Sequence, residues 1–234
     1  MSMPPLPPLH PAGYPFILIA AFGAFLLSYA GSEAFFLGVI LTGWVMYFFR
    51  DPARVTPTEE GLLVSPADGL VIAIKRDVVP EKVLGLGEEK RTRISIFLNV
   101  FDVHINRIPI TGKITNVDYR KGKFVNASLD KASEDNERNA IAIDIEGDHP
   151  FNGHKVGVVQ IAGLIARRIM CFVAESQHVK TGQRFGLIRF GSRTDVYLPV
   201  GMEPLVCVGQ RVLGGETIIA DCVGSQKQME GEVR

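Results

Sequence analysis

The sequence predicts a mainly β fold: an antiparallel, barrel-sandwich-like domain preceded by an N-terminal hydrophobic helical hairpin. From Leu62 onward, apolar and β-branched residues alternate with polar ones, which is typical of half-buried strands. Glycine-rich turns separate these segments. Residues 16–49 instead contain two apolar runs with almost no charge. The chain has 234 residues, enough for one large domain and an appendage.

The N-terminal region divides into a leader and two apolar runs. Residues 1–15 are rich in proline and lack the basic start of a secretory signal, so we expect a flexible leader that is not cleaved. The runs 16–30 and 35–49 are each shorter than the roughly twenty residues that cross a bilayer as a straight helix. They could form a hairpin in the membrane or pack as helices against a soluble domain. The scarcity of charge favours the membrane.

Charge flanking the runs predicts their orientation. Arg50 and Arg54 follow the second run, so the positive-inside rule places the large domain on the cytoplasmic side of the cell membrane. The predicted organisation is therefore a leader at 1–15, a membrane-associated hairpin at 16–54 and a β-rich domain at 55–234.

Composition excludes several classes of protein. Lysine and arginine balance aspartate and glutamate at 25 each, so no net field favours nucleic acid. The three cysteines, Cys171, Cys207 and Cys222, have no CxxC spacing, which argues against a disulfide framework and a zinc site. We expect them to be reduced core residues, and we expect no metal.

Period-two patterning predicts the strands of the β-rich domain in order. They are expected at 62–64, 70–74, 93–100, 103–110, 113–119, 140–145, 155–161, 166–173, 184–190 and 194–198. The strands at 155–161 and 166–173 are predicted to form a hairpin around Gly163. Residues 121–137 are polar and predict a long surface loop, a kind of segment that is often functional.

A short internal echo supports a compact antiparallel fold. Gly-Gln-Arg occurs at 182–184 and again at 209–211, each time before an apolar residue and a further glycine. The echo is either the recurring turn of barrel-sandwich carrier domains or two independent hairpin turns. A carrier role itself is not indicated, because no lysine occupies a hairpin tip in an apolar context.

The Gly191-Ser192 pair could carry chemistry. A serine hydroxyl can attack the carbonyl of the preceding residue and turn the amide into an ester. β-Elimination would leave dehydroalanine at 192, which hydrolyses to a pyruvoyl group and ammonia. Glycine before the serine leaves the carbonyl open to attack. By itself the dipeptide is more often an ordinary turn.

Several motifs in one order make the chemical interpretation more specific. They are Phe48-Phe49-Arg50-Asp51-Pro52, Ser65-Pro66-Ala67-Asp68-Gly69, Phe101-Asp102-Val103-His104, Asn136-Glu137-Arg138-Asn139 and the run 179–199 around Gly191-Ser192. With them the chain resembles phosphatidylserine decarboxylases in their short bacterial or archaeal form, over most of its length.

The resemblance implies an activity. It implies self-cleavage between Gly191 and Ser192, and a pyruvoyl cofactor made from Ser192, without metal or pyridoxal phosphate. The ketone would form a Schiff base with phosphatidylserine and act as the electron sink for its decarboxylation to phosphatidylethanolamine and CO2.

The resemblance also implies roles for two side chains. Asp68, which alone would suggest only an Asx turn, would orient the self-cleavage machinery. His104, on the same face of its segment as Asp102, would protonate the product at Cα and activate Ser192. Longer members resemble Asp-x-His-x-x-His here, whereas this chain has Arg107, which cannot act as a base. Either His104 serves both steps or cleavage relies on strain and Asp68; we favour the former.

Three further residues have candidate roles. His178 is a second candidate base, and Arg167-Arg168 could contact a lipid phosphate or form a solvated edge. The expected partners are phosphatidylserine in the membrane and the two cleavage products as a heterodimer, with further oligomerisation undetermined. The alternatives are an archaetidylserine decarboxylase and a non-catalytic, membrane-tethered binding module.

Overall fold

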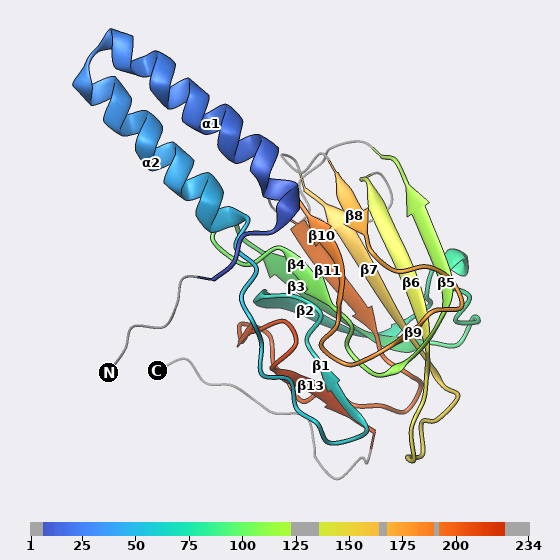
Figure 1. Cartoon of the computed structure of the whole chain (residues 1–234). Helices are drawn as coiled ribbons and strands as arrows, with labels where there is room; N and C mark the ends of the chain where they lie inside the picture. Colours follow the sequence, from blue (N-terminus) through green and yellow to red (C-terminus); the bar gives the residue numbers. More distant parts are fainter. Residues whose placement is uncertain (1–6, 123–135, 164–167, 190–191, 223–234) are drawn as a thin grey trace, which may run out of the picture. The chain divides into compact units, whose positions relative to one another are not determined.

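The computed structural model describes residues 7–122, 136–163, 168–189 and 192–222 (Figure 1). The chain forms two compact units. The first contains residues 1–53 and 101–103, and the second contains residues 54–100 and 104–234. Every described α-helix belongs to the first unit and every described strand to the second. This division agrees with the mainly β fold, carrying an N-terminal apolar helical segment, that the sequence predicts.

The first unit is a helical hairpin (Figure 1). It consists of η1 (Pro11–Gly13), α1 (Tyr14–Leu27), η2 (Ser28–Ala30) and α2 (Ser32–Phe48). Helical structure thus begins inside the predicted leader, where Pro11 and Pro15 suit the first turns of their helices. The helices turn at Gly31, whose φ of +126° favours glycine. Gly38 lets them approach, because a Cβ there would lie 2.6 Å from the Cα of Ala24.

Apolar side chains remain exposed over most of this hairpin. Leu18, Ile19 and Ile40 are each 70% exposed. Pro11–Ala30 is a 20-residue apolar helical segment, long enough to cross a membrane, whereas α2 falls short of that length. In both α1 and α2 the apolar residues extend around the helix instead of forming one stripe, a pattern typical of helices in an apolar surrounding.

The second unit is built from antiparallel sheets. Its strands are β1 (Leu62–Val64), β2 (Gly69–Val78), β3 (Arg91–Leu98), β4 (Ile105–Arg107), β5 (Gly112–Arg120), β6 (Arg138–Ile145), β7 (Lys155–Ala162), β8 (Ile169–Cys171), β9 (His178–Val179), β10 (Arg184–Ile188), β11 (Ser192–Tyr197), β12 (Arg211–Val212) and β13 (Ile218–Asp221). A short 3-10 helix, η3 (Lys82–Leu84), follows β2.

The longest sheet has the order β12-β2-β3-β11-β7-β6-β5-β9 and curls into a half-barrel. A second sheet has the order β4-β10-β8, and β1 pairs with β13. Alternate residues of the long strands point to opposite faces, so Ile94, Ile141 and Val196 share the main core cluster. On the other face, Tyr197 belongs to a smaller cluster with Leu84.

The Gly-Gln-Arg echo is a repeated turn. At Gly182-Gln183 and at Gly209-Gln210, the glutamine N–H donates to the carbonyl three residues earlier, and its side-chain oxygen accepts from that residue's N–H. Each glycine N–H donates to the carbonyl of a facing residue, Ile108 or Val71, whose own N–H donates to the glutamine carbonyl. The glycines have φ of +79° and +89°. The echo is therefore one turn used twice.

Two expectations for single strands are wrong. The hairpin predicted around Gly163 does not form, because β7 already has β11 and β6 as neighbours, and β8 pairs with β10 instead. The strand predicted at 103–110 is reduced to β4. Both errors arise because periodicity reports which face is buried and not which strand is the neighbour.

Candidate functional site

Ser192 is the first residue of β11, in the centre of the long sheet. Its register partners are Leu98 of β3 and Ala162 of β7. The side chain is fully buried, and Oγ has no hydrogen-bond partner among the described residues. Such a hydroxyl costs about 1–3 kcal/mol and calls for an explanation, such as a catalytic role. Gly191, the other half of the predicted cleavage site, lies outside the described residues.

His104 directly precedes β4 and pairs with the end of β10 through its backbone. The carbonyl of His104 accepts from the N–H of Ile188 at 3.1 Å, and Ile188 clusters with Ala162, the neighbour of Ser192. Asn106, two residues further on, points its amide at Thr194 of β11. His104 is fully buried, and it lies two residues before Asn106 in an extended segment, in which alternate residues share a face.

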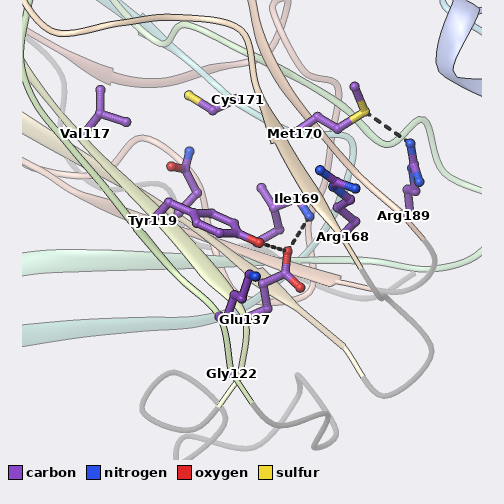
Figure 2. Close-up of a pocket in the computed structure, with 11 residues that line it drawn as sticks. Val117, Tyr119, Gly122, Glu137, Arg168, Ile169, Met170, Cys171 and Arg189 are labelled. Atoms are coloured by element: carbon purple, nitrogen blue, oxygen red, sulfur yellow. Dashed lines mark hydrogen bonds between the residues drawn. The ribbon is translucent and has the colours of Figure 1, made fainter.

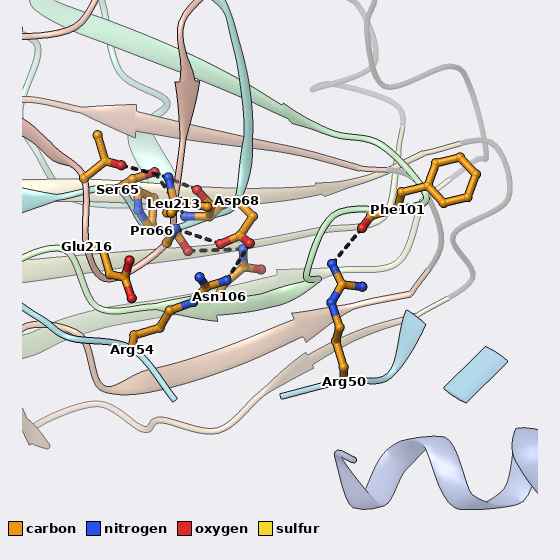
Figure 3. A network of polar contacts seen from close by, with 12 residues as sticks. Arg50, Arg54, Ser65, Pro66, Asp68, Phe101, Asn106, Leu213 and Glu216 are labelled. Carbon is orange, nitrogen blue, oxygen red and sulfur yellow. Dashed lines mark hydrogen bonds and ion pairs between the residues drawn. The ribbon is translucent and has the colours of Figure 1, made fainter. Parts of the chain in front are cut away.

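Asp68 is buried in the Ser-Pro-Ala-Asp-Gly turn and has defined partners (Figure 3). Its Oδ2 lies 2.6 Å from a guanidinium nitrogen of Arg54, and Oδ1 accepts from the N–H of Gly214 at 2.8 Å. Leu70 shares a row with Phe97 and Arg193, so β2 lies about 10 Å from β11 at ordinary strand spacing. Sequence reasoning missed the role of Arg54 as the partner of Asp68.

A chain of buried amides connects this turn to the sheet. Asn106 donates from Nδ2 to the carbonyl of Pro66 at 3.3 Å, and its Oδ1 accepts from Nε2 of Gln160 at 2.6 Å. Oε1 of Gln160 accepts from Nδ2 of Asn139 at 2.9 Å. The Pro66 carbonyl can only accept a hydrogen bond, so Asn106 must donate to it from Nδ2. This in turn fixes which group donates and which accepts in each later hydrogen bond of the row. The final oxygen, Oδ1 of Asn139, has no partner among the described residues.

Asn139, the last of these buried amides, lines a cavity of about 910 Å³ (Figure 2). Its lining consists of Val117, Tyr119, Lys121, Gly122, Glu137, Asn139, Arg168, Ile169, Met170, Cys171 and Arg189. Oε1 of Glu137 accepts from the Tyr119 hydroxyl and from the Ile169 N–H, each at 2.8 Å. The volume lies within the range of small-molecule sites.

Positive charge gathers on one wall of the cavity. Burial lowers the pKa of Arg189, and the nearby guanidinium of Arg168 lowers that pKa further. A guanidinium N–H of Arg189 lies 3.4 Å from Sδ of Met170. Burial, then the contact with Glu137, raises the pKa of Tyr119. An arginine that is partly desolvated beside another arginine is typical of an anion-binding position.

Two other residues considered from the sequence are not placed at Ser192. His178, the second candidate base, is exposed on β9 at the sheet edge, with Nδ1 3.1 Å from a Glu146 carboxylate oxygen. Arg107 donates to the carbonyl of Gly182 at 2.9 Å and alternates with Asn106, so it faces away from the Ser192 row. Arg167 lies outside the described residues.

Metal-ligand groupings are also missing from the part of the chain that the structure describes: no cluster of three or more histidine, cysteine, aspartate or glutamate side chains is suitably placed there. Of the cysteines, Cys222 is buried and Cys171 and Cys207 are half-buried, all as free thiols. Burial raises the pKa of Cys222 to about 12, so this thiol is an inert core group at neutral pH.

Comparison with known proteins places the chain in a family. Residues 41–220 match the family model described as phosphatidylserine decarboxylase. The chain belongs to the phosphatidylserine decarboxylase family. It is 53% identical over 227 residues to a protein of Cereibacter sphaeroides, covering 97% of this chain and 95% of the relative. Relatives from Beijerinckia indica and Ruegeria pomeroyi are each 53% identical over 92% of this chain. The matched stretch covers 89% of the Beijerinckia protein and 96% of the Ruegeria protein.

All three relatives carry the name phosphatidylserine decarboxylase proenzyme. The prediction of this family, and of a decarboxylase as the class of enzyme, is thereby confirmed. Asp68, His104 and Ser192 all lie inside the matched range. The long surface loop predicted at 121–137 also lies inside it, although residues 123–135 are not among those described.

Proposed function

We propose that this chain cleaves itself between Gly191 and Ser192, and that the product decarboxylates phosphatidylserine to phosphatidylethanolamine and CO2. The observation that carries the proposal is the Ser192 hydroxyl, which is buried in a central strand without a hydrogen-bond partner among the described residues. The proenzyme names of the relatives support a cleavage step. The backbone of His104 pairs with Ile188, whose side chain clusters with Ala162, the register partner of Ser192, and this supports His104 as the base.

Self-cleavage uses only atoms of the chain and one water. Oγ of Ser192 gives its proton to a base and bonds to the Gly191 carbonyl carbon, and the peptide C–N bond breaks as the Ser192 nitrogen takes up a proton. Loss of the Ser192 Cα proton then breaks the Cβ–Oγ bond, so Gly191 leaves as a carboxylate. Water replaces the nitrogen of the resulting dehydroalanine, which departs as ammonia and leaves the pyruvoyl group.

The chain's own side chains handle the protons. His104 is the base for the Ser192 hydroxyl and later supplies a proton to Cα of the product. Asp68, held by Arg54 and Gly214, fixes the turn that packs against β3 beside Ser192. Its ion pair is nearly buried, so removing one partner would leave an uncompensated charge and cost roughly 3–5 kcal/mol.

The pyruvoyl ketone supplies an electron sink, so the proposed reaction calls for neither pyridoxal phosphate nor a metal. The buried position of Ser192 suits such a group, because the surrounding strands exclude water from the reacting atoms.

The two products of cleavage should remain together as a heterodimer. β11 is in the downstream product and lies between β3 and β7 of the upstream one, and β13 pairs with β1 in the same way. Phe185 of β10 and Val196 of β11 belong to the same core cluster, so separation would expose that core to water.

The apolar hairpin supports a location at the cell membrane, where the lipid substrate resides. In this proposal residues 16–54 form the membrane-associated segment and residues 55–234 the catalytic domain on the cytoplasmic side. The exposed apolar side chains of α1 and α2 support insertion, and Arg50 and Arg54 after α2 support the orientation.

Intact mass under denaturing conditions tests the proposal. The wild-type chain should appear as two polypeptides, the smaller one beginning with a pyruvoyl group. Ser192→Ala should remain a single chain of 25.6 kDa. Ser95→Ala removes another buried hydroxyl, from the adjacent strand β3, and should be cleaved normally. A wild-type protein that decarboxylates phosphatidylserine while unbroken would exclude this mechanism, and an unbroken, inactive chain would indicate a binding module.

A further inference from the structure

The 910 Å³ cavity has a charged wall that the chemistry at Ser192 does not explain. We propose that Arg168 and Arg189 bind the phosphodiester of the lipid headgroup and thereby hold the substrate's amine toward residue 192. This inference rests on the proposed function, and it names a part of the substrate that this wall recognises.

The cavity lies close enough to Ser192 for one headgroup to reach both. Ala162 is the register partner of Ser192, and the N–H of Ala162 donates to the carbonyl of Glu137, which lines the cavity. Two strand spacings separate these rows, or about 10 Å. Arg189 also follows directly after β10, three residues before Ser192 in the sequence. A serine phosphodiester covers only part of this distance between its amine and its phosphorus, so the long arginine side chains would have to extend toward it.

Charge in the cavity is complementary to an anion. Among the described lining residues, Lys121, Arg168 and Arg189 stand against one carboxylate, that of Glu137. Oε1 of that carboxylate is already bound by the Tyr119 hydroxyl and the Ile169 N–H. Arg189 is partly desolvated beside Arg168, an arrangement that an anion between the two guanidinium groups would stabilise.

The reaction itself indicates which anion belongs there. The substrate carboxylate loses its charge as CO2 departs, so two arginines on it would stabilise the ground state more than the transition state and slow the reaction. The phosphodiester keeps its charge from substrate to product. Binding it supplies positioning energy without opposing decarboxylation.

The test compares soluble short-chain phosphatidylserine as substrate with short-chain phosphatidylethanolamine as a competing product. Both contain the phosphodiester, but only the former contains the carboxylate. Arg189→Gln and Arg168→Gln should each raise KM for the substrate and Ki for the product by roughly ten- to hundredfold. Arg76→Gln, which alters an exposed arginine paired with Glu203, should leave both constants unchanged.

Intact mass is recorded for every variant, so that a failure of self-cleavage is distinguished from a failure of binding. If cleaved Arg168→Gln and Arg189→Gln bind the product like wild type, the inference is overturned while the proposed function stands. A rise in KM with unchanged Ki would assign the arginines to the carboxylate and also overturn it. Inhibition by inorganic phosphate as strong as that by the lipid, and lost in the same variants, would indicate a free-phosphate site instead.

Discussion

The Ser192 hydroxyl combines full burial with the absence of a hydrogen-bond partner among the described residues. In an ordinary strand a buried serine donates to a nearby carbonyl, and leaving it unpaired costs free energy. In the proposed mechanism, Oγ of Ser192 attacks the preceding carbonyl, and a hydroxyl that lacks a partner among the described residues has its lone pairs available for that step. At the scale of single residues, this is the feature that supports a chemical role for Ser192.

His104→Ala tests whether one histidine serves both chemical steps. We expect the variant to remain uncleaved and inactive, because His104 is a buried histidine whose backbone partner, Ile188, clusters with the register partner of Ser192. Intact mass and CO2 release are the measurements. His178→Ala is the matched control and should behave like wild type, because His178 is exposed and pairs with Glu146. Normal cleavage of His104→Ala without decarboxylation would disprove the double role.

At the scale of elements, the buried amide chain connects three parts of the second unit. Asn106 of β4 contacts the Pro66 carbonyl, Gln160 of β7 and Thr194 of β11. These contacts link the turn that carries Asp68 to the strand that begins at Ser192. Since every member is buried, the chain stabilises the fold only while all its hydrogen bonds are made.

Gln160→Leu should therefore destabilise the fold by roughly 2–5 kcal/mol, because it removes the buried donor to Oδ1 of Asn106 and the buried acceptor of Nδ2 of Asn139. Urea unfolding of the Ser192→Ala chain, with and without the change, measures the difference on a single polypeptide. Gln183→Leu removes one bond at an exposed turn and should cost at most about 1.5 kcal/mol. Equal losses for the two variants would show that the buried chain has no special role.

At the scale of the whole molecule, the chain has an apolar helical unit and a β-rich unit. The proposed phospholipid substrate would explain why one polypeptide contains both, since a membrane-bound hairpin would hold the enzyme where that substrate resides. The β-rich unit also explains how a cut chain could stay folded. Its central strand, β11, would belong to the downstream product and is paired on both sides.

Ile40→Asp should weaken membrane binding by about a hundredfold, since aspartate at the centre of a membrane helix costs roughly 3 kcal/mol. Ile40 is 70% exposed on α2. Flotation with phospholipid vesicles measures the bound fraction. Leu213→Asp, at a half-exposed site in the second unit, should float like wild type. If Ile40→Asp floats equally well, the hairpin does not insert in the membrane.

The sequence by itself determined the family, most of the strands and the residues that are candidates for the chemistry. Alternation revealed the strands because burial of one face needs only local pattern, and the separate motifs pointed to Ser192, His104 and Asp68. The repeated Gly-Gln turn was also visible, because its geometry depends on a few adjacent residues.

Only the tertiary structure decided which of these residues meet. Arg54 pairs with Asp68, Gln160 links Asn106 to Asn139, and β8 pairs with β10 although β7 is nearer in sequence. The cavity walled by Arg168 and Arg189 likewise combines residues from separate strands and loops. Strand neighbours and buried polar partners follow from how the whole core closes, and local pattern contains no information about that closure.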